Sequence, residues 1–261
     1  LSEAPIFIEI DRQTDPVVIE DLKKSIMHIL HDVELAVDDW QKICTKVKEI
    51  IHSLETHPLA IDPAEIQESI AFLNWLLSDH FIFLGYRDYQ LDKENGDIAL
   101  RVVDGSGLGV LRDSKPGKIS KHFSEMPPEA RTEALSKHML IISKSSFESR
   151  VHRAVKNDLI GIKVFDEQGN VIGEHRILGL YTSTAYNSRP YSIPVLREKV
   201  KEVMTKSKLS ATGHAGKALL NILENLPRDD LFQASTDELL DLSMGILHLQ
   251  ERRVIRLFVR K

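Results

Sequence analysis

The longest regular pattern of apolar and polar residues runs from Val17 to about Glu55, a stretch without glycine or proline. Apolar residues recur there every seven positions in two interleaved series, Ile19, Ile26, Val33, Trp40, Val47 and Leu54 in the first and Leu22, Ile29, Ala36, Ile43 and Ile50 in the second. This heptad pattern predicts a long helix, roughly 60 Å in length, that packs lengthwise on another. Asp15-Pro16 predicts its start, because Asp caps a helix and Pro fits the first turn.

Two partners fit this helix equally well: a second subunit, which would make it an oligomerisation helix, or other helices of the same chain. His28, His31 and Glu34 also share part of one face of the helix. Their spacing allows a metal site, but solvated polar residues beside an apolar seam are the favoured interpretation.

Two shorter elements flank this helix. Residues Ile6–Ile10 alternate as a short strand would. After the break at His57-Pro58, the signals for a second helix are unusually complete. Asp62 can cap it, Pro63 takes its first position and Glu65 can close a capping box.

The middle of the chain is rich in strand patterns. The predicted strands and turns are Phe81–Leu91, a hairpin turn at Glu94–Asp97, Ile98–Val103, Gly107–Leu111, Met139–Lys144 and a long hairpin that turns at Glu167–Asn170. Between them, Ser114–Lys137 is polar and predicts a loop with a short helix. One helix followed by antiparallel strands with an insertion is the layout of a small α+β sensory domain.

From Pro194 the pattern is helical again, with three predicted helices. Ser235 and Glu238 are placed to form the capping box of the last one. Val254–Lys261 then alternates as a strand without visible partners. Because the sequence also begins at Leu1 rather than Met, we expect a fragment of a longer polypeptide.

Composition narrows the class of protein. The 261 residues include 42% hydrophobic and 28% charged residues, which is ordinary for a globular protein. The net charge of -5 argues against a broad surface for nucleic acid or anionic membranes. A single cysteine, Cys44, excludes an internal disulfide and favours a cytoplasmic location. Neither a signal peptide nor an apolar run of roughly 20 residues is present, so we expect no membrane partner.

Three motifs suggest chemistry but lack defining residues. The loop Asp104–Gly109 is glycine-rich, but Val110 stands where a dinucleotide fingerprint needs glycine, so a turn is favoured. Gly216-Lys217 lacks the first glycine and the hydroxyl residue of a phosphate loop. Serines near His152 at positions 145, 146 and 149 lack a nucleophile elbow. No catalytic, cofactor-binding or metal residue is therefore predicted.

A basic stretch gives the candidate ligand-binding residues. Arg150, His152 and Arg176, with Arg153 and Lys156, are predicted along paired strands. Alternation would aim some of them inward, where an arginine needs an acid, either a glutamate of the protein or an anionic ligand. A solvated sheet face is the favoured alternative. Arg150, His152 and Arg176 remain the candidate contacts for a ligand.

Several strings together resemble a known family. They are EIDRQTDP, VELAVDDW, FLGYRDY, the stretch from Ser149 to Tyr186 with GEHRILGLYTS, SIPVLREKV, LPRDDLFQ and LQERRVIRLFVRK. In this order they resemble the N-terminal half of the large bacterial NAD-dependent glutamate dehydrogenases. That family deaminates glutamate to 2-oxoglutarate with NAD, and its catalytic and NAD-binding residues lie downstream of this segment.

The resemblance implies a regulatory and assembly segment that is inactive alone. It implies the end of an ACT-like module with the long helix (1–60), a PAS-like α+β domain (61–193), a helical segment (194–253) and the first strand of another ACT-like module (254–261). The implied partners are the catalytic part of the same polypeptide, further copies in a homo-oligomer and a small amino-acid or oxo-acid effector. Two alternatives stay open: a stand-alone PAS-like metabolite sensor and a purely structural oligomerisation module.

Overall fold

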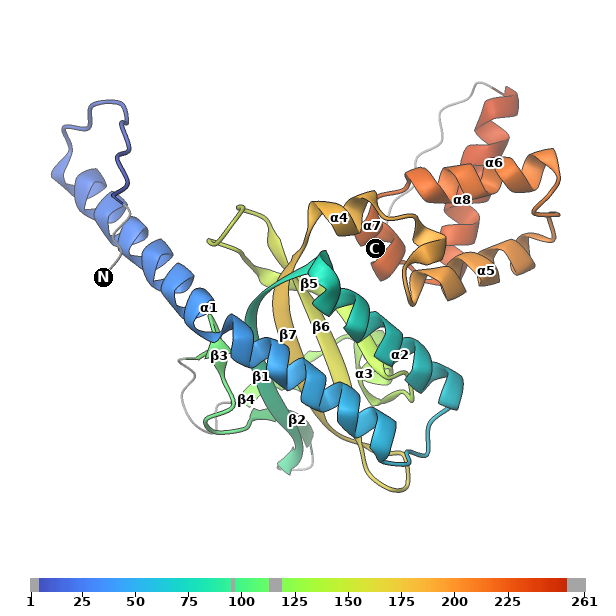
Figure 1. Cartoon of the computed structure of the whole chain (residues 1–261), viewed down its shortest axis with the longest axis horizontal. Helices are drawn as coiled ribbons and strands as arrows, with labels where there is room; N and C mark the ends of the chain where they lie inside the picture. Colours follow the sequence, from blue (N-terminus) through green and yellow to red (C-terminus); the bar gives the residue numbers. More distant parts are fainter. Residues whose placement is uncertain (1–4, 95–96, 113–118, 253–261) are drawn as a thin grey trace.

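The computed structural model of the protein describes residues 5–94, 97–112 and 119–252. A long helix, a curled antiparallel sheet and a group of further helices follow one another along the chain (Figure 1). This order confirms the predicted α+β class, with its long N-terminal helix and antiparallel sheet. None of the helices in the described ranges is both long and apolar enough to cross a membrane.

Helix α1, Pro16–Thr56, confirms the predicted long helix. The Asp15 carboxylate accepts a hydrogen bond from the backbone N–H of Val17 at 2.9 Å, so the predicted cap forms. The second half of α1 packs on the sheet and on helix α2, and its buried apolar residues are Leu35, Ala36, Ile43, Val47, Ile50 and Ile51. The first half projects away from the sheet (Figure 1). Its exposed apolar residues are Val17, Val18, Ile19, Leu22, Ile26, Met27, Ile29, Leu30 and Val33. The heptad pattern therefore has a same-chain partner only along its second half, within the described residues.

The predicted strand at Ile6–Ile10 is wrong: these residues have no regular secondary structure and are exposed. A strand requires a neighbour to bind its backbone N–H and C=O groups. No strand in the described part of the chain lies against this segment. The alternation of apolar and polar residues is therefore not sufficient to form a strand at Ile6–Ile10.

Helix α2, Pro63–Trp75, begins as predicted, because Asp62 accepts a hydrogen bond from the N–H of Ala64 at 2.9 Å. The predicted capping box is wrong. The Glu65 carboxylate instead accepts a hydrogen bond from the N–H of Met139 at 2.9 Å, at the start of a distant strand. A short π-helix, η1 (Leu76–His80), connects α2 to the sheet and contains Asp79 in the left-handed region at φ 61°.

The sheet has seven strands in the described residues, and all neighbouring pairs are antiparallel. They are β1 Phe81–Glu94, β2 Asp97–Val102, β3 Leu108–Gly109, β4 Ile119–His122, β5 Leu140–Glu148, β6 Lys156–Phe165 and β7 Val171–Tyr181. The order is β4-β2-β1-β7-β6-β5, and the short β3 also pairs with β1. The first and last long strands in the sequence, β1 and β7, thus lie side by side at the centre.

Both predicted hairpins are confirmed. The β1–β2 register ends with Glu94 opposite Asp97, on either side of the predicted turn, whose residues 95–96 lie outside the described ranges. The turn between β6 and β7 forms where Asp166 accepts hydrogen bonds from the N–H groups of Gln168 and Asn170 at 3.0 and 2.8 Å. Both turns are local, which explains why the sequence predicts them well.

The prediction of a loop with a short helix at Ser114–Lys137 is wrong in one respect. It contains strand β4, which pairs with β2, besides the short 3-10 helix η2 (Phe123–Glu125) and the predicted short helix, α3 (Pro128–Leu135). The β4 sequence is short and largely polar, as edge strands often are, so it carries no apolar alternation.

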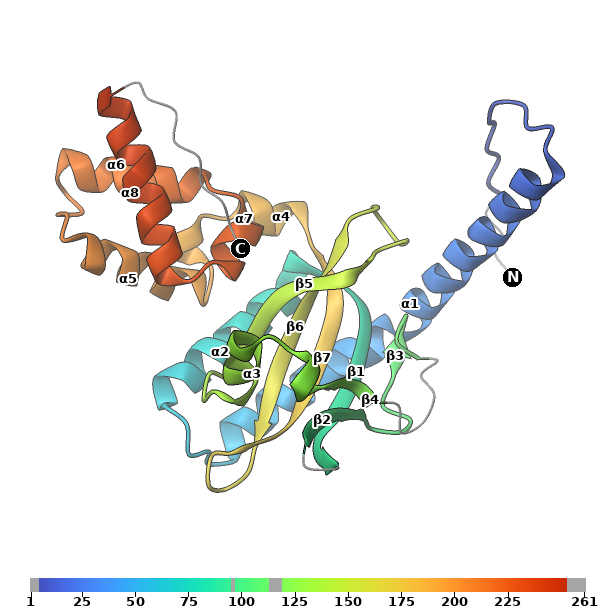
Figure 2. The same cartoon turned by 180° about the vertical axis from the view of Figure 1, so that it is seen from behind.

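The two faces of the sheet are covered differently, as Figures 1 and 2 show from opposite sides. Helices α1 and α2 cover one face over the main hydrophobic core. The other face carries a smaller core of Tyr89, Leu100, Val102 and Phe123. Beside it the buried Lys163 ammonium donates to the carbonyl of Glu133 and to the hydroxyl of Ser136, and burial lowers the pKa of Lys163.

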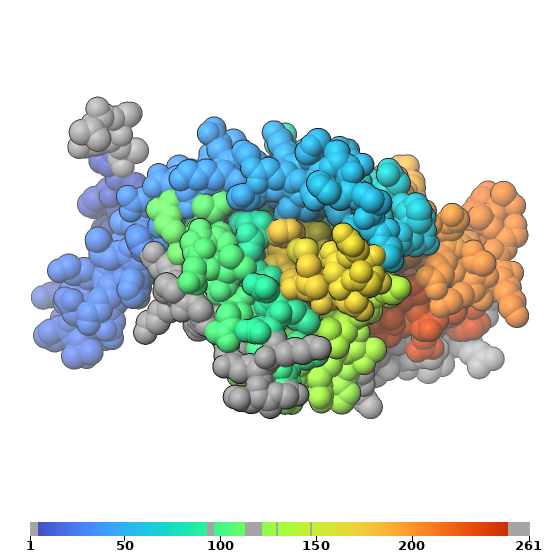
Figure 3. Space-filling model, turned by 90° about the horizontal axis from the view of Figure 1, so that it is seen from below, coloured from blue at the N-terminus to red at the C-terminus, as the bar shows by residue number. Residues whose placement is uncertain are grey.

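The chain after β7 is helical. The helices are α4 Ser183–Asn187, η3 Pro190–Ser192 (a 3-10 helix), α5 Leu196–Ser207, α6 His214–Asn225, α7 Arg228–Gln233 and α8 Thr236–Arg252. At the start of α8, the Glu238 carboxylate accepts from the N–H of Ser235 at 2.7 Å, and the N–H of Glu238 donates to the Ser235 hydroxyl at 3.2 Å. The strand predicted at Val254–Lys261 lies outside the described residues. This helical group lies at the end of the molecule opposite the projecting start of α1 (Figure 3).

Candidate functional site

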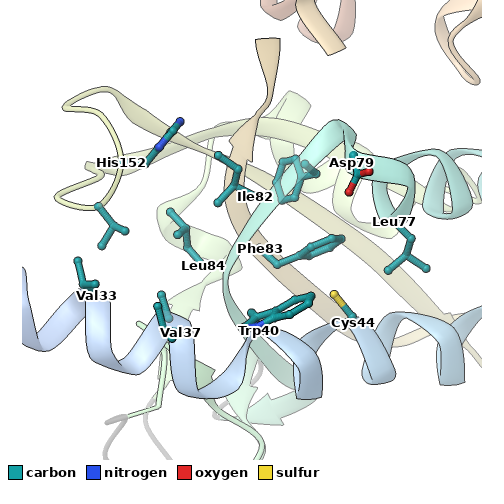
Figure 4. Close-up of a pocket in the computed structure, with 13 residues that line it drawn as sticks. Val33, Val37, Trp40, Cys44, Leu77, Asp79, Ile82, Phe83, Leu84 and His152 are labelled. Atoms are coloured by element: carbon teal, nitrogen blue, oxygen red, sulfur yellow. The ribbon is translucent and has the colours of Figure 1, made fainter. Parts of the chain in front are cut away.

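A cavity of about 520 Å³ lies between α1 and the first half of β1, and we call it the α1–β1 cavity. Figure 4 shows side chains from successive turns of α1 on one side and from β1 on the other. Its apolar lining consists of Val33, Ala36, Val37, Trp40, Leu77, Phe81, Ile82, Phe83, Leu84 and Val151. A mainly apolar cavity of this size with a few polar groups is the usual form of a small-molecule site.

Three residues with polar or reactive groups line the same cavity: Cys44, Asp79 and His152. Burial raises the pKa of the Cys44 thiol, which keeps it protonated. Asp79 and His152 both have left-handed backbones, with φ of 61° and 72°. Such conformations are uncommon outside glycine and cluster at functional sites.

The loop 149–155 joins β5 to β6 and closes one end of the α1–β1 cavity. The Ser149 N–H donates to the Val155 carbonyl at 2.7 Å, and the Ser149 hydroxyl donates to the Val151 carbonyl at 2.7 Å. These bonds fix the loop, so Ser149 has a structural role. Val151 packs in a small apolar cluster with Ala36 of α1.

The three predicted ligand contacts do not come together. The sequence pattern predicts Arg150 and His152 on paired strands, and this is wrong. Both residues lie in the loop 149–155. The Arg150 guanidinium is largely exposed and lies 3.7 Å from the Asp32 carboxylate of α1. Arg176 lies on β7, on the sheet face away from α1, and its guanidinium binds Glu174 at 2.8 Å.

Arg176 points inward, and its acid is a glutamate of the protein. Besides Glu174, it stacks on the ring of Tyr89, with its guanidinium carbon 4.2 Å from the ring centroid. The partner of Arg176 is therefore a glutamate of the protein rather than an anionic ligand. Only His152 of the three candidates lines the α1–β1 cavity.

A partly buried polar network joins the sheet to the helical group, and the sequence did not predict it. The Lys144 ammonium on β5 lies 2.5 Å from Asp158 on β6 and 3.0 Å from Asp229 on α7. Burial works against the charge, but the two carboxylates raise the pKa of Lys144. The Tyr186 hydroxyl of α4 donates to Asp229 at 3.1 Å. Arg153 of the loop 149–155 lies over the Tyr186 ring, 5.3 Å from its centroid.

Aromatic stacking reinforces the same junction. The Tyr181 ring at the end of β7 stacks on Phe232 of α7, with centroids 4.9 Å apart and planes at 7°. Arg228 binds the carbonyls of Ser188, Glu224 and Leu226 with its guanidinium. The strings GEHRILGLYTS and LPRDDLFQ thus meet in space, which gives their unusual sequences a structural role.

A second cavity, of about 620 Å³, lies between the end of α1 and the β6–β7 hairpin. Its polar lining includes His175, whose Nδ1 lies 2.6 Å from Asp88 and 3.0 Å from the Tyr86 hydroxyl. Burial favours a higher pKa for Asp88, but hydrogen bonds from His175 and Tyr86 lower it. Burial and the neighbouring carboxylate raise the pKa of Tyr86 far above its usual value.

The weaker motifs have structural explanations. The loop Asp104–Gly109 is a turn between β2 and β3, and a Cβ at Gly109 would lie 2.1 Å from the Leu84 carbonyl oxygen. Gly216 lies inside α6, where a Cβ would meet the Ser210 carbonyl oxygen at 2.0 Å. His31 and Glu34 are exposed and 3.8 Å apart. Close backbone approach, rather than phosphate binding, accounts for both glycines.

The loop Asp104–Gly109 does not fit the pyrophosphate of NAD. The glycine-rich turn Asp104–Gly109 leads into a strand, and no helix in the described ranges starts there to hold a pyrophosphate. The carbonyl of Leu84 on β1 occupies the space next to Gly109 that a phosphate would need. Any NAD used by a longer polypeptide would need to bind outside this loop.

Comparisons with known proteins give the chain its relatives. Residues 193–252 match the family model "Glutamate dehydrogenase, helical motif 1". The chain is 40% identical over 260 residues to the NAD-specific glutamate dehydrogenase of Halomonas elongata and 36% identical over 259 residues to that of Pseudomonas aeruginosa. Each match covers 99% of this chain and 16% of the relative. The NAD-specific glutamate dehydrogenase of Mycobacterium tuberculosis is 23% identical over 268 residues, 100% of this chain and 15% of the relative.

The chain thus spans 16% of the length of the first two relatives. These matches support the resemblance of this chain to a segment of large NAD-specific glutamate dehydrogenases.

Proposed function

We propose that this chain is a non-catalytic regulatory and assembly segment of a large NAD-dependent glutamate dehydrogenase, an enzyme that deaminates glutamate to 2-oxoglutarate. The observation that carries the proposal is the match of 99% of the chain to 16% of two enzymes named NAD-specific glutamate dehydrogenase. NAD and the catalytic residues belong, in this proposal, to the remaining part of the polypeptide.

The assembly role is supported by the first half of α1. Its apolar side chains are exposed, and Ile19, Ile26 and Ile29 are between 39% and 49% exposed. The apolar stripe is wide, since Leu30 and Met27 extend it beyond the two heptad series. A wide stripe suits a sheet or a bundle better than a narrow two-stranded seam. We propose that this half of α1, with the strand-like Ile6–Ile10, completes an ACT-like module of the same polypeptide.

The regulatory role is supported by the junction between sheet and helices. The PAS-like domain proposed for residues 61–193 and the helical segment proposed for 194–253 are joined through Lys144, Asp158 and Asp229. We propose that a change in the geometry of this junction alters subunit contacts in a homo-oligomer and so reaches the catalytic part. Regulation requires that an effector bind two states of the enzyme with different affinity.

Activity measurements on three proteins test the proposal. Glutamate-dependent reduction of NAD is measured for this chain alone, for the full-length polypeptide and for the full-length Lys144→Met variant. We expect no activity from the chain alone, activity from the full-length protein and a changed KM, effector response or oligomeric state in the variant. Activity of the chain alone would show that the segment is catalytic. A variant identical to the parent in all three properties would exclude a regulatory role for this junction.

A further inference from the structure

We propose that the turn before α5 is a strained hinge, which Glu68 of α2 holds in one of two arrangements. The turn consists of Pro194 and Val195 and lies between η3 and α5, where the chain enters the helical group (Figure 1). With Glu68 bound, the turn has the conformation described here. Without it, the backbone of Val195 relaxes and the first turn of α5 changes its direction relative to α2. The inference concerns this chain alone and does not depend on the proposed function.

The backbone of Val195 carries the strain. Its φ is 71° and its ψ is -49°, outside the left-handed helical region and close to the γ-turn of positive φ, which is rare and strained. Valine is β-branched, and such residues avoid positive φ more strongly than others. The other non-glycine residues with positive φ in the described ranges are Asp79, His152 and Lys208. Asp and His adopt this region more readily, and Lys208 ends α5, where a left-handed residue is common.

Two buried side chains and one carboxylate keep Val195 in this conformation. Ile193 and Leu196, on either side of the turn, are both 0% exposed, so both ends of the turn are fixed in the core. The Glu68 carboxylate accepts a hydrogen bond from the N–H of Val195 at 2.6 Å. It also accepts hydrogen bonds from Nε of Arg197, at 2.8 Å, and from a terminal nitrogen of the same guanidinium. A strained backbone persists only where its surroundings impose it, and here one side chain of α2 binds two residues of the turn and of α5.

The charge of Glu68 makes this contact strong. Its side chain is 19% exposed. Burial favours a higher pKa, but the hydrogen bonds from Arg197 and from the N–H of Val195 lower the pKa of Glu68, so the carboxylate stays ionised. Hydrogen bonds to an ionised acceptor are stronger than neutral ones. A glycine would adopt the angles of residue 195 without strain, whereas valine favours the relaxed arrangement and Glu68 opposes that preference.

The strain is tested by comparing glycine and alanine at position 195. Val195→Gly and Val195→Ala both remove the packing of the side chain, but only glycine adopts positive φ freely. We expect the midpoint of thermal unfolding of Val195→Gly to lie about 2–4 °C above that of Val195→Ala. Lys201, an exposed residue inside α5, is the matched control, because alanine should be more stable than glycine there. A Val195→Ala midpoint equal to or above that of Val195→Gly would overturn the proposal.

Hydrogen exchange of single backbone amides tests the role of Glu68. The N–H of Arg197 donates to the Ile193 carbonyl at 2.9 Å, across the turn, so its exchange reports opening of the hinge. Glu68→Ala should speed exchange at Arg197 about tenfold or more and leave the amides of α6 unchanged. The added Val195→Gly should slow exchange at Arg197 again, because the turn no longer gains by relaxing. Glu198→Gln, an equal loss of charge on an exposed side chain of α5, should leave exchange at Arg197 unchanged.

Two outcomes of the exchange experiment would contradict the hinge. Unchanged exchange at Arg197 in Glu68→Ala would show that the carboxylate does not hold the turn. Faster exchange throughout α5, α6 and α8 would show a general loss of stability instead of a local opening. Glu68→Gln retains an oxygen that can accept from Val195, so it should give a smaller rise at Arg197 and provides the same test if Glu68→Ala does not fold.

Discussion

The buried carboxylate of Asp39 offers the sharpest test of how α1 is attached to the sheet. Asp39 is fully buried on α1, and its carboxylate accepts hydrogen bonds from the N–H of Gly109 at 2.9 Å and from Arg112 at 2.8 Å. The Lys42 ammonium lies 2.9 Å from its other oxygen. Asp39→Asn would remove the negative charge, keep the shape of the side chain and leave these donors facing an amide.

The magnitude follows from the pKa of Asp39. Burial favours a higher value, but the hydrogen bonds from Gly109, Lys42 and Arg112 together lower the pKa from 3.8 to about 2. A difference of this size between the unfolded and folded states corresponds to about 2 kcal/mol of folding free energy. Because the folded-state pKa is the lower one, this stability is fully present above pH 3.8. It is lost as the pH falls from 3.8 towards 2.

Urea unfolding of the wild type and Asp39→Asn measures the effect. At neutral pH the variant should have a free energy of unfolding lower by about 2 kcal/mol. The difference should shrink as the pH falls through the window between 3.8 and about 2. Glu34→Gln, an exposed neighbour on the same helix, should change stability by less than about 0.5 kcal/mol. A deficit that is absent at neutral pH, or that stays constant down to low pH, would refute the reasoning.

Three further predictions concern the sheet, the junction and the last helix. Gly179→Ala should destabilise the protein by about 2 kcal/mol in thermal unfolding, because a Cβ there would lie 2.1 Å from the carbonyl oxygen of Ile82 on β1; an unchanged midpoint would contradict this. Lys144→Met should cost about 3 kcal/mol, because the buried Asp158 carboxylate would lose its cation. It should also make α7 more susceptible to limited proteolysis, because Asp229 would lose its contact with the sheet. Equal cleavage of both proteins would count against that role. Ser235→Ala should lower stability by about 1 kcal/mol through loss of the capping box, whereas an effect below about 0.3 kcal/mol in urea unfolding would show that Glu238 alone suffices.

The sequence predicts those parts of the fold that depend on neighbouring residues. The cap at Asp15, the length of α1 and the turn at Asp166 follow from local hydrogen bonds and from apolar periodicity. Parts that depend on distant residues were predicted poorly. Glu65 has the position that a capping box requires, but its carboxylate accepts a hydrogen bond from the distant N–H of Met139 instead. The alternation at Ile6–Ile10 likewise has no effect without a neighbouring strand.

The candidate site was predictable only in part, for the same physical reason. His152 was named from the sequence, but its role there depends on α1 and β1, which lie far from it along the chain. The bridge from Lys144 to Asp229 depends on tertiary contacts that leave no periodic signal. The sequence favoured a solvated sheet face for Arg176, but the structure places its guanidinium against Glu174 of the protein.

The loop 149–155 is where an effect on the cavity would reach other parts of the molecule. Arg150 contacts Asp32 of α1, His152 lines the cavity, and Arg153 donates to the Tyr181 carbonyl at 3.0 Å beside the helical junction. A ligand that displaced His152 would therefore act on a seven-residue loop that touches α1 on one side and the junction on the other. It would shift the balance between two arrangements only by the difference in its affinity for them. Arg153→Gln in the full-length polypeptide removes the contacts of this loop with the junction and tests whether a change in the loop is transmitted. A changed KM for glutamate in a variant of unchanged stability is the result that a transmitting loop requires.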